Sequence, residues 1–146
     1  MDALTEIVNN KYIYIPFLVW LSIQIFKTIN DLIITRKFNF KRIMGAGGMP
    51  SSHSGVVCSL AVLIGKYEGF NSAMFGVALI FALVVMYDAA GVRRAAGKQA
   101  AILNKIVETP HLTNLEVQEK LVELLGHTPV QVFVGALLGI MAGIIF

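Results

Sequence analysis

The stretch Gly47-Gly48-Met49-Pro50-Ser51-Ser52-His53-Ser54-Gly55 places small, hydrogen-bonding residues and a histidine directly before an apolar segment. Small polar residues in this position are typical of a helix start. The first N–H groups of a helix have no intrahelical partner and carry partial positive charge, so a helix start is a natural site for anions. A histidine can exchange a proton near neutral pH. The stretch therefore predicts a helix whose first turn binds a phosphate-like anion.

The composition of the chain is that of a membrane protein. Of its 146 residues, 56% are hydrophobic and 14% are charged, whereas roughly a quarter of the residues in soluble domains are charged. The mean hydropathy of +0.72 and four long uncharged stretches favour an integral membrane protein over the alternative, a soluble bundle of buried helices. The length predicts a single domain, residues 1–146. The single cysteine, Cys58, cannot form an internal disulfide and is interpreted as a packing residue.

Four apolar stretches are candidates for membrane spans. They are Tyr12–Phe26, which can extend to Ile34, and then Ser54–Gly65, Gly69–Tyr87 and Thr128–Phe146. A hydrocarbon core of about 30 Å needs roughly 20 helical residues, so these spans are short and the second is the shortest. No small-x-small cleavage signal follows the first span, which is therefore interpreted as retained. The predicted fold is all-α: a polytopic membrane helical bundle of about four transmembrane helices plus a cytoplasmic helical segment.

The segment between the third and fourth spans, Gly91–Gly126, is predicted to be this helical segment. Ala95–Val107 is rich in good helix formers, and Pro110 interrupts the pattern. Thr113-x-x-Glu116 is a capping box for a further helix that ends at Gly126. The apolar surface of that helix lies either on the bilayer or on the bundle.

Basic residues are distributed unevenly between the two ends of the spans. The segments that follow the first and third spans lie on the same side of the membrane, and ten of the twelve lysines and arginines lie on that side. Only Lys11 and Lys66 lie on the other side. Loops rich in lysine and arginine stay in the cytoplasm. We therefore expect a multi-pass protein of the plasma membrane, with both long loops in the cytoplasm and both termini outside.

This topology brings two histidines and several charged residues to one membrane face. His53 begins the second span and His127 begins the fourth, while Asp88 lies at the end of the third. Arginine and lysine bind phosphate oxygens, and of two histidines one can attack phosphorus while the other protonates the leaving oxygen. The combination favours phosphoryl transfer on a lipid headgroup, with neither a metal nor a cofactor. The residues predicted to bind the substrate phosphate are Lys27, Arg42, Ser51, Ser52, Arg93 and Arg94.

The same residues resemble a known family. Pro50-Ser51-Ser52-His53 is similar to the P-S-G-H motif of the type-2 phosphatidic acid phosphatase and vanadium haloperoxidase superfamily. Gly126–Gln131, followed by Gly135–Gly139, is similar to the later half of its S-R-x5-H-x3-D motif. The run Tyr87–Arg94, together with His127, resembles the divergent bacterial and plant branch of that superfamily. This resemblance covers most of the chain after Lys27.

The resemblance implies a membrane-embedded phosphatase of lipid phosphates or pyrophosphates that works through a phosphohistidine. It makes His127 the nucleophile and His53 the acid/base. Lys27, with Arg36 or Arg42, takes the place of the basic residues in the upstream K-x6-R-P motif. The substrates that fit are phosphatidic acid, phosphatidylglycerol phosphate and polyprenyl phosphates or pyrophosphates, and the sequence does not choose among them.

Gln131 departs from the family pattern, because it occupies the position of the motif aspartate. A glutamine can accept a hydrogen bond from an imidazole N–H but cannot stabilise the imidazolium by charge. Either Asp88 or Glu123 supplies that charge, or the nucleophile is weak. In the second case the chain is a lipid-phosphate binding or transport protein that keeps the pocket without turnover. A purely structural membrane subunit is a third interpretation.

Some of the charged residues have simpler interpretations. Successive helical residues point about 100° apart, so one of Arg93 and Arg94 is expected in the site, with Arg93 slightly favoured, while the other anchors the membrane face. His111 lies in a polar loop and is interpreted as solvated. A metal site made of His53, His127 and Asp88 is an alternative that no tight ligand spacing supports.

Gly135, Gly139 and Gly143 recur every four residues in the last span, a spacing typical of close helix packing. This stripe packs either against another span of the same chain or against a second copy. The superfamily typically has a six-helix core, whereas four spans are predicted here, so we expect a homodimer to complete the site. The other expected partners are the bilayer and the lipid phosphate substrate, and no nucleic acid is expected.

Overall fold

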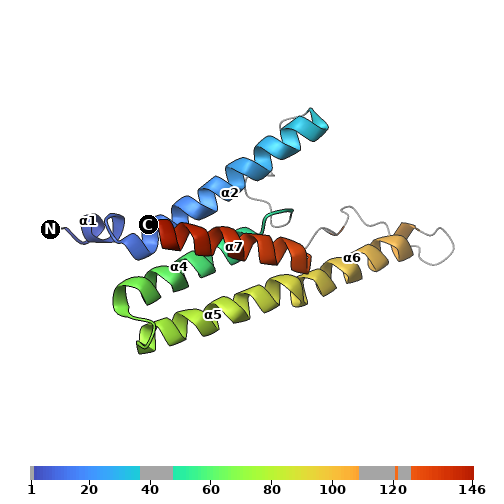
Figure 1. The fold of residues 1–146 in the computed structure, drawn as a ribbon. Helices are drawn as coiled ribbons and strands as arrows, with labels where there is room; N and C mark the ends of the chain where they lie inside the picture. Colours follow the sequence, from blue (N-terminus) through green and yellow to red (C-terminus); the bar gives the residue numbers. More distant parts are fainter. Residues whose placement is uncertain (1, 37–47, 109–120, 122–125) are drawn as a thin grey trace.

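The computed structural model describes residues 2–36, 48–108, 121 and 126–146. Within these ranges the chain forms α-helices and no strand, which confirms the predicted all-α fold (Figure 1). The helices are α1 (Ala3–Val8), α2 (Lys11–Thr35), α4 (Ser52–Glu68), α5 (Ala73–Ala90), α6 (Val92–Glu108) and α7 (Pro129–Ile145).

The predicted spans correspond to α2, α4, α5 and α7, and local features set the helix ends. α5 starts later than the predicted third span because Gly69 adopts a φ of 95° and ends α4, after which Ser72 caps α5 by accepting the Phe75 N–H at 3.1 Å. Thr128 caps α7 in a reciprocal capping box with Gln131.

Of the two further helices, the sequence predicted one and not the other. The short helix α1 was not predicted. α6 contains the predicted stretch Ala95–Val107 and follows α5 almost without interruption. The predicted capping box at Thr113 and Glu116 lies outside the described residues.

α4 lies at the centre of the bundle, in contact with α2, α5 and α7. α7 approaches it so closely that a Cβ on Gly135 would lie 2.2 Å from the carbonyl oxygen of Ser51, and one on Gly139 would lie 2.3 Å from that of Gly55. Glycine allows two helix backbones to approach this closely. The positions of α4 and α7, and of everything attached to their first turns, are therefore fixed relative to each other.

The glycine stripe thus packs within one chain. Gly135, Gly139 and Gly143 are all buried, and Gly143 faces Val62 and Ser59 of α4. The expected homodimer contact through these three glycines is corrected, because α4 of the same copy already covers them. Association of two copies through another surface stays a prediction.

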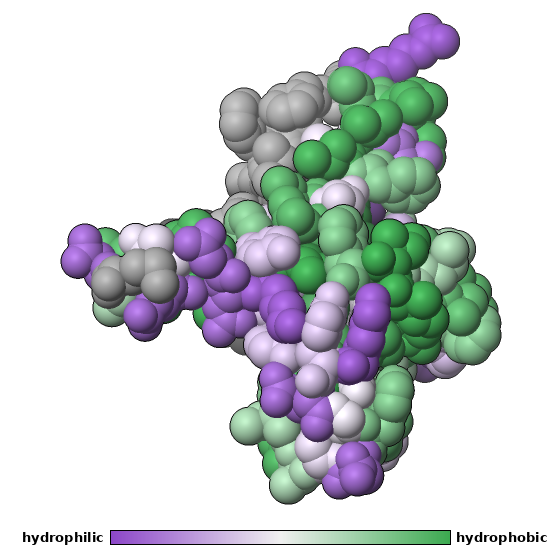
Figure 2. All heavy atoms as spheres, turned by 60° about the vertical axis from the view of Figure 1, so that its left-hand side comes forward, coloured by the Kyte–Doolittle hydropathy of each residue, from purple (hydrophilic) through white to green (hydrophobic). Residues whose placement is uncertain are grey.

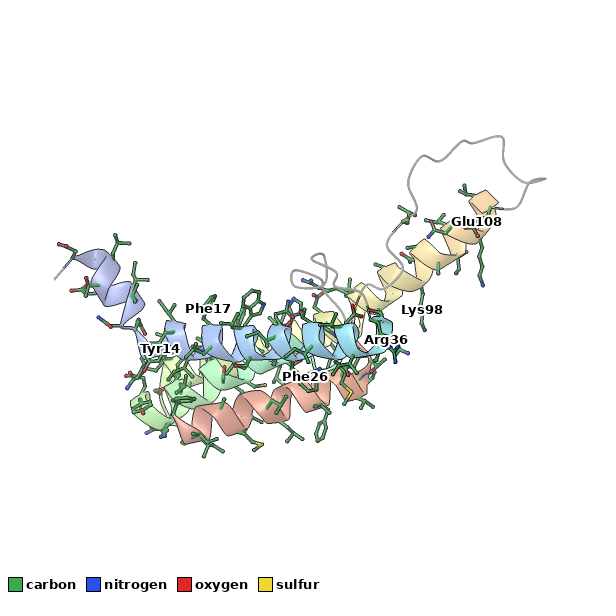
Figure 3. All side chains as sticks on the ribbon, turned by 90° about the horizontal axis from the view of Figure 1, so that it is seen from above. Tyr14, Phe17, Phe26, Arg36, Lys98 and Glu108 are labelled. Atoms are coloured by element: carbon green, nitrogen blue, oxygen red, sulfur yellow. The ribbon has the colours of Figure 1, made fainter. Side chains whose placement is uncertain are left out.

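The two ends of the bundle differ. Both chain termini lie at one end, and the starts of α4 and α7 lie at the other (Figure 1). At the end that carries the termini, Lys66 Nζ donates to the carbonyl oxygen of Ile144 at 3.0 Å. At the other end, α6 continues beyond the bundle, where Figure 3 labels Lys98 and Glu108.

The surface of the bundle is apolar over wide areas. Lys11–Thr35 and the almost continuous Ala73–Glu108 are long and apolar enough to cross a membrane, and α7 is a shorter apolar helix. Large apolar side chains such as Val77 and Phe133 are more than 60% exposed. Figure 2 shows hydrophobic residues across much of one face. Because soluble monomers rarely expose such large apolar patches, this surface fits a lipid environment.

Candidate functional site

Two histidines meet at the end of the bundle where α4 and α7 begin. His53 lies in the first turn of α4, and His127 directly precedes Thr128, the N-cap of α7. Their ring centroids are 5.8 Å apart and their planes are inclined by 63°. His127 is only 2% exposed. The close packing of α4 on α7 thus produces a pair of imidazoles from residues far apart in the sequence.

Backbone contacts fix the position of His127. Its N–H donates to the carbonyl oxygen of Ala89, at the end of α5, at 2.8 Å. The preceding Gly126 has a φ of 86°, and a Cβ there would lie 2.3 Å from the backbone nitrogen of Arg94. Only glycine fits such a conformation at such a close approach. The segment before α7 is therefore held against the junction of α5 and α6.

Gln131 sets the state of the His127 ring. Its Oε1 accepts the Thr128 N–H at 3.0 Å and lies 3.4 Å from His127 Nδ1. Because Oε1 is an acceptor, Nδ1 carries the proton in this contact and Nε2 carries the lone pair. Nε2 is buried and has no hydrogen-bond partner among the described residues. Burial lowers the pKa of His127, which favours the neutral ring.

The start of α4 is organised by Ser51. Its Oγ accepts the N–H of Ser54 at 3.4 Å and the hydroxyl of Ser54 at 3.1 Å, and its N–H donates to the carbonyl oxygen of Gln131 at 3.0 Å. Ser51 is 0% exposed, so its hydroxyl acts as a helix cap. Helix geometry leaves the N–H groups of Ser52 and His53 without intrahelical partners. The first turn of α4 therefore offers anion donors beside the His53 ring.

Charged side chains surround the histidine pair. Arg93 Nε donates to Asp88 Oδ2 at 2.6 Å, which uses one of the five N–H donors of the guanidinium. The charges of Arg93, Lys27 and Asp88 all act on His53, and that of Lys27 also acts on His127. Lys27 is only 3% exposed although it belongs to the apolar helix α2. Positive charge is thus concentrated at the two imidazoles.

A cleft of about 720 Å³ opens beside His53, between α2, α4 and α5. One part of its lining is polar and the other is apolar. The polar part consists of Gln24, Ser52, His53, Asp88 and Arg93. The apolar part consists of Trp20, Val56, Val57, Phe81, Val84 and Val85. Such a lining suits an amphipathic ligand with an anionic group.

Comparison with known proteins identifies the family of the chain. The model of the "Divergent PAP2 family" matches residues 8–142. The chain belongs to the divergent PAP2 family. It is 41% identical over 129 residues to the protein named "Uncharacterized membrane protein YuiD" from Bacillus subtilis (strain 168), with 81% of this chain and 82% of the relative covered. No solved structure matches the chain. The predicted family relation is confirmed, and the chain is a membrane protein.

In this divergent PAP2 protein, the fold gathers several of the predicted site residues. Ser52, His53, Asp88 and Arg93 line one cleft, and His127 adjoins His53. Asp88 contacts Arg93. No contact between Asp88 and the His127 ring is found in the described part of the chain.

Two other predicted residues lie outside the cleft lining. Ser51 is a buried helix cap and does not line the cleft. Arg94 is exposed, and its backbone packs against Gly126. Arg42 lies outside the described residues, as does Glu123. Within the described ranges, no group of three His, Cys, Asp or Glu side chains is arranged to hold a metal ion.

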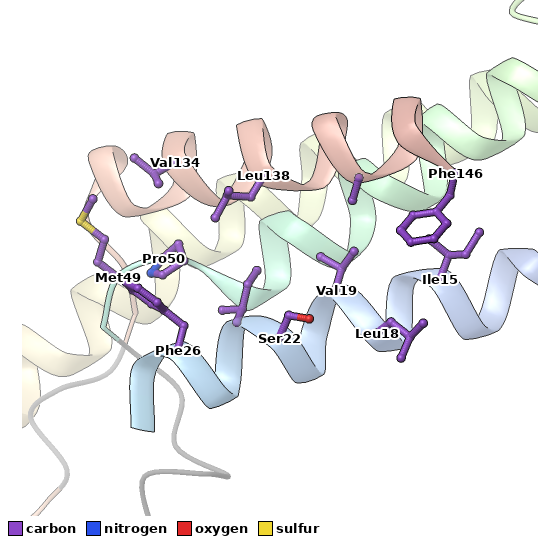
Figure 4. A pocket seen from close by; sticks show the side chains of 12 residues that line it. Ile15, Leu18, Val19, Ser22, Phe26, Met49, Pro50, Val134, Leu138 and Phe146 are labelled. Atoms are coloured by element: carbon purple, nitrogen blue, oxygen red, sulfur yellow. The ribbon is translucent and has the colours of Figure 1, made fainter. Parts of the chain in front are cut away.

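The chain has a second cleft, of about 640 Å³, on the other side of α2 (Figure 4). It is lined by α2 and α7, and Met49 and Pro50 close one end. Its lining is apolar except for Ser22. With no charged group, it can bind hydrocarbon but offers nothing to a phosphate.

Gln24 is a site residue that the sequence analysis missed. It is 4% exposed and lines the cleft with His53. The available signal was the spacing of Trp20, Gln24 and Lys27, which puts one aromatic and two polar residues on one face of an apolar helix.

Proposed function

We propose that this member of the divergent PAP2 family hydrolyses the phosphate or pyrophosphate of a membrane lipid at the His53–His127 pair. The observation that supports it best is the state of His127. Its Nδ1 faces the acceptor Gln131 Oε1, and its buried Nε2 has no partner among the described residues while lying beside a second imidazole. A neutral imidazole with a free lone pair is the form required for attack on phosphorus.

The reaction has two steps. In the first, His127 Nε2 forms a bond to phosphorus, the bond from phosphorus to the lipid oxygen breaks, and His53 gives a proton to that oxygen. In the second, His53 takes a proton from water, the water oxygen forms a bond to phosphorus, and the bond to Nε2 breaks. Lipid alcohol and inorganic phosphate are the products. For a pyrophosphate, the leaving group is the lipid monophosphate.

Positive groups around the pair support charge stabilisation in both steps. Arg93, held by Asp88, offers its remaining N–H donors to phosphate oxygens, and Lys27 adds a second charge. The N–H groups at the start of α4 add dipoles beside His53. In this arrangement Asp88 orients Arg93, and Gln131 orients His127 without giving it a counter-charge.

Phosphate release and trapping of the covalent intermediate test the proposal. The purified chain in detergent is mixed with a panel of lipid phosphates and pyrophosphates, and the acid-labile, base-stable phosphoramidate is sought on His127 by mass spectrometry. His127→Ala should abolish both signals, and His53→Ala should lower kcat by about 10²- to 10⁴-fold. His111→Ala is the matched control. Activity that survives in His127→Ala would refute the nucleophile assignment.

A second candidate function is a lipid-phosphate binding protein without turnover, and Gln131 is the observation that favours it. A neutral orienting group stabilises the imidazolium less than a carboxylate does. If the parent chain and Gln131→Glu bind lipid phosphate but neither releases phosphate, the binding function holds and the enzyme is excluded.

The proposal includes a multi-pass arrangement in the plasma membrane with the histidine end facing the cytoplasm and both termini outside. The basic residues that support it include Arg36, which ends α2 beyond Lys27, and Lys66, which bonds to Ile144 near the C-terminus. Single cysteines at positions 36 and 66, each in a Cys58→Ala background, should react with a membrane-impermeant thiol reagent from opposite sides in cells and inverted vesicles. Reaction from the same side would overturn this topology.

A further inference from the structure

Two lysines meet at the end of the bundle that carries the chain termini. Lys11 Nζ lies over the ring of Tyr67, 3.1 Å from its centroid, and Lys66 Nζ lies 5.4 Å from the same centroid. Lys11 Nζ is also 5.3 Å from the centroid of the Tyr12 ring. α2 and α4 therefore bring two positive charges to one tyrosine, at the end of the bundle opposite the histidine pair (Figure 1).

The two ammonium groups are not paired with carboxylates. Within the described ranges neither lysine forms an ion pair, and the carboxylate of Glu68 accepts the hydroxyl of Tyr12. Lys66 donates one hydrogen bond, to the carbonyl oxygen of Ile144, and Lys11 donates none to the residues that the structure describes. Because an ammonium group has three N–H donors, the pair keeps most of its donors for an anion.

Helix stability accounts for Lys66 but not for Lys11. Lys66 lies in the last turn of α4, where a cation is favourable, and it caps a carbonyl group at the end of α7. Lys11 is the first residue of α2, where the positive end of the helix dipole disfavours a cation. Its position near a second lysine adds like-charge repulsion. An anion bound between the two lysines would relieve both costs.

The lysines lie at one end of the apolar cleft between α2 and α7. Ile15 lines that cleft one turn after the first lysine, and so does Phe146, whose carbonyl oxygen accepts the Tyr67 hydroxyl at 2.6 Å. Figure 4 shows Ile15 and Phe146 at one end of the cleft and Met49 and Pro50 at the other. The cleft thus runs from the lysine pair toward the histidine end of the bundle.

The length of this cleft matches one hydrocarbon chain. Its lining extends along α2 from Ile15 to Phe26, and along α7 from Val134 to Phe146. At 1.5 Å per residue, these stretches are about 17 Å and about 18 Å long. The hydrocarbon layer of one bilayer leaflet is about 15 Å thick. Because the lining is apolar except for Ser22, an acyl chain from the adjoining leaflet fits along it.

We propose that this end of the protein binds one anionic phospholipid of the adjoining leaflet, with the phosphate between Lys11 and Lys66 and one acyl chain in the cleft between α2 and α7. The lysines account for the charge of the ligand, and the cleft accounts for its hydrocarbon. The bound lipid connects the start of α2 to the ends of α4 and α7. The site is separate from the cleft beside His53, so it does not depend on the proposed hydrolysis.

Native mass spectrometry of the full chain, released from detergent micelles, counts bound lipids and measures their affinities. Three ligands are compared: a phosphatidylglycerol, a phosphatidylcholine with the same acyl chains, and glycerophosphoglycerol, which is the first headgroup without chains. We expect the anionic lipid to bind about 10-fold more tightly than the zwitterionic lipid. The headgroup alone should not bind at the same concentrations.

Substitution of the lysines tests the headgroup contacts. Lys11→Gln should lower the affinity for phosphatidylglycerol about fivefold, and the double variant with Lys66→Gln should lower it about 25-fold, because each basic residue contributes roughly this factor at a membrane surface. The affinity for phosphatidylcholine should change less than about twofold. Lys98→Gln is the matched control, since Lys98 is an exposed lysine on α6, beyond the histidine end (Figure 3). If the double variant does not fold, Lys11→Gln alone decides.

Ser22→Trp tests the cleft, because the indole would occupy the space of the acyl chain. It should lower the affinities for both lipids about 10-fold, whereas Val77→Trp, at a 66% exposed position on α5, should lower neither. The proposal is overturned if Lys11→Gln binds phosphatidylglycerol as tightly as the parent chain, or if Lys98→Gln weakens binding equally. It is also overturned if Ser22→Trp changes neither affinity, or if the headgroup alone binds as tightly as the lipid.

Discussion

Replacing Gly139 by alanine tests whether the approach of α7 to α4 is as close as described. The new Cβ would lie 2.3 Å from the carbonyl oxygen of Gly55 and 3.0 Å from its carbonyl carbon and Cα. Ordinary contacts begin near 3.4 Å, so the two helices must separate by roughly 1 Å. The atoms that obstruct the methyl group belong to the backbone, which cannot rotate away as a flexible side chain would.

Two effects of opposite sign determine the result. Overpacking of a tight interface costs about 1–3 kcal/mol. Alanine stabilises a helix interior by about 1 kcal/mol relative to glycine. Gly76, in α5, isolates the second effect, because a Cβ there has no other atom within 4 Å. We expect Gly139→Ala to be less stable than Gly76→Ala by about 1–3 kcal/mol.

The assay is unfolding by sodium dodecyl sulfate in mixed micelles, followed by circular dichroism, with both variants measured beside the parent chain. Gly76→Ala should match or exceed the parent in free energy of unfolding. The separation of α4 from α7 should also move His127 away from His53, and an error of about 1 Å at a reacting pair can cost 10²-fold in rate. Equal stability of the two variants would refute the packing described for Gly139.

The remaining predictions concern His127 and its supports. Burial lowers the pKa of His127, and only the neutral ring attacks phosphorus. As the pH falls, phosphate release should therefore be lost only below the ordinary histidine pKa of about 6.5. A pH–rate profile whose acid limb lies above that value would contradict this. Gln131→Glu keeps the length of the side chain and adds a negative charge. It should raise kcat roughly 10-fold and move the acid limb of the pH–rate profile to higher pH. An unchanged profile would show that the side chain at position 131 does not act on the His127 ring. Gly126→Ala should lower the free energy of unfolding by about 1–3 kcal/mol, since both the φ of 86° at Gly126 and the nearby backbone of Arg94 exclude a Cβ. An unchanged free energy of unfolding in the same assay would contradict that contact. Phosphate release should persist in excess EDTA, because Arg93 supplies the charge that a metal would otherwise provide, and inactivation reversed by added metal would refute this.

The helices were predictable because their signals are local. Apolar runs marked α2, α4, α5 and α7, and Thr128 marked the start of α7, since a threonine before a proline is a common helix N-terminus. The start of α5 was misplaced because Gly69 and Ser72 act through backbone conformation and capping, which hydropathy does not register. The short helix α1 has no long apolar run and left no comparable signal.

The site was predictable only in part, because its residues meet through packing. The motif residues His53 and His127 could be paired on chemical grounds, but their separation depends on how closely α7 lies on α4. Ser51 was expected at the phosphate and instead caps a helix, since a serine before a helix suits either role equally well. Gln24 belongs to no motif, and only the packing of α2 on α4 brings it to the cleft.

The neutral side chain at position 131 determines which groups must balance the charge on His127 in the proposed reaction. A carboxylate would raise the pKa of His127 and stabilise the imidazolium, whereas Gln131 accepts from Nδ1 and leaves burial to keep the ring neutral. The charge that develops when Nε2 bonds to phosphorus must then be balanced from the phosphate side. Arg93 and the first turn of α4 lie there, and Asp88 holds Arg93. In the proposed mechanism, the carboxylate that the superfamily motif directs at the nucleophile is replaced by Asp88, which is directed at a cation, so Asp88→Asn should weaken phosphate binding more than it perturbs the acid limb of His127.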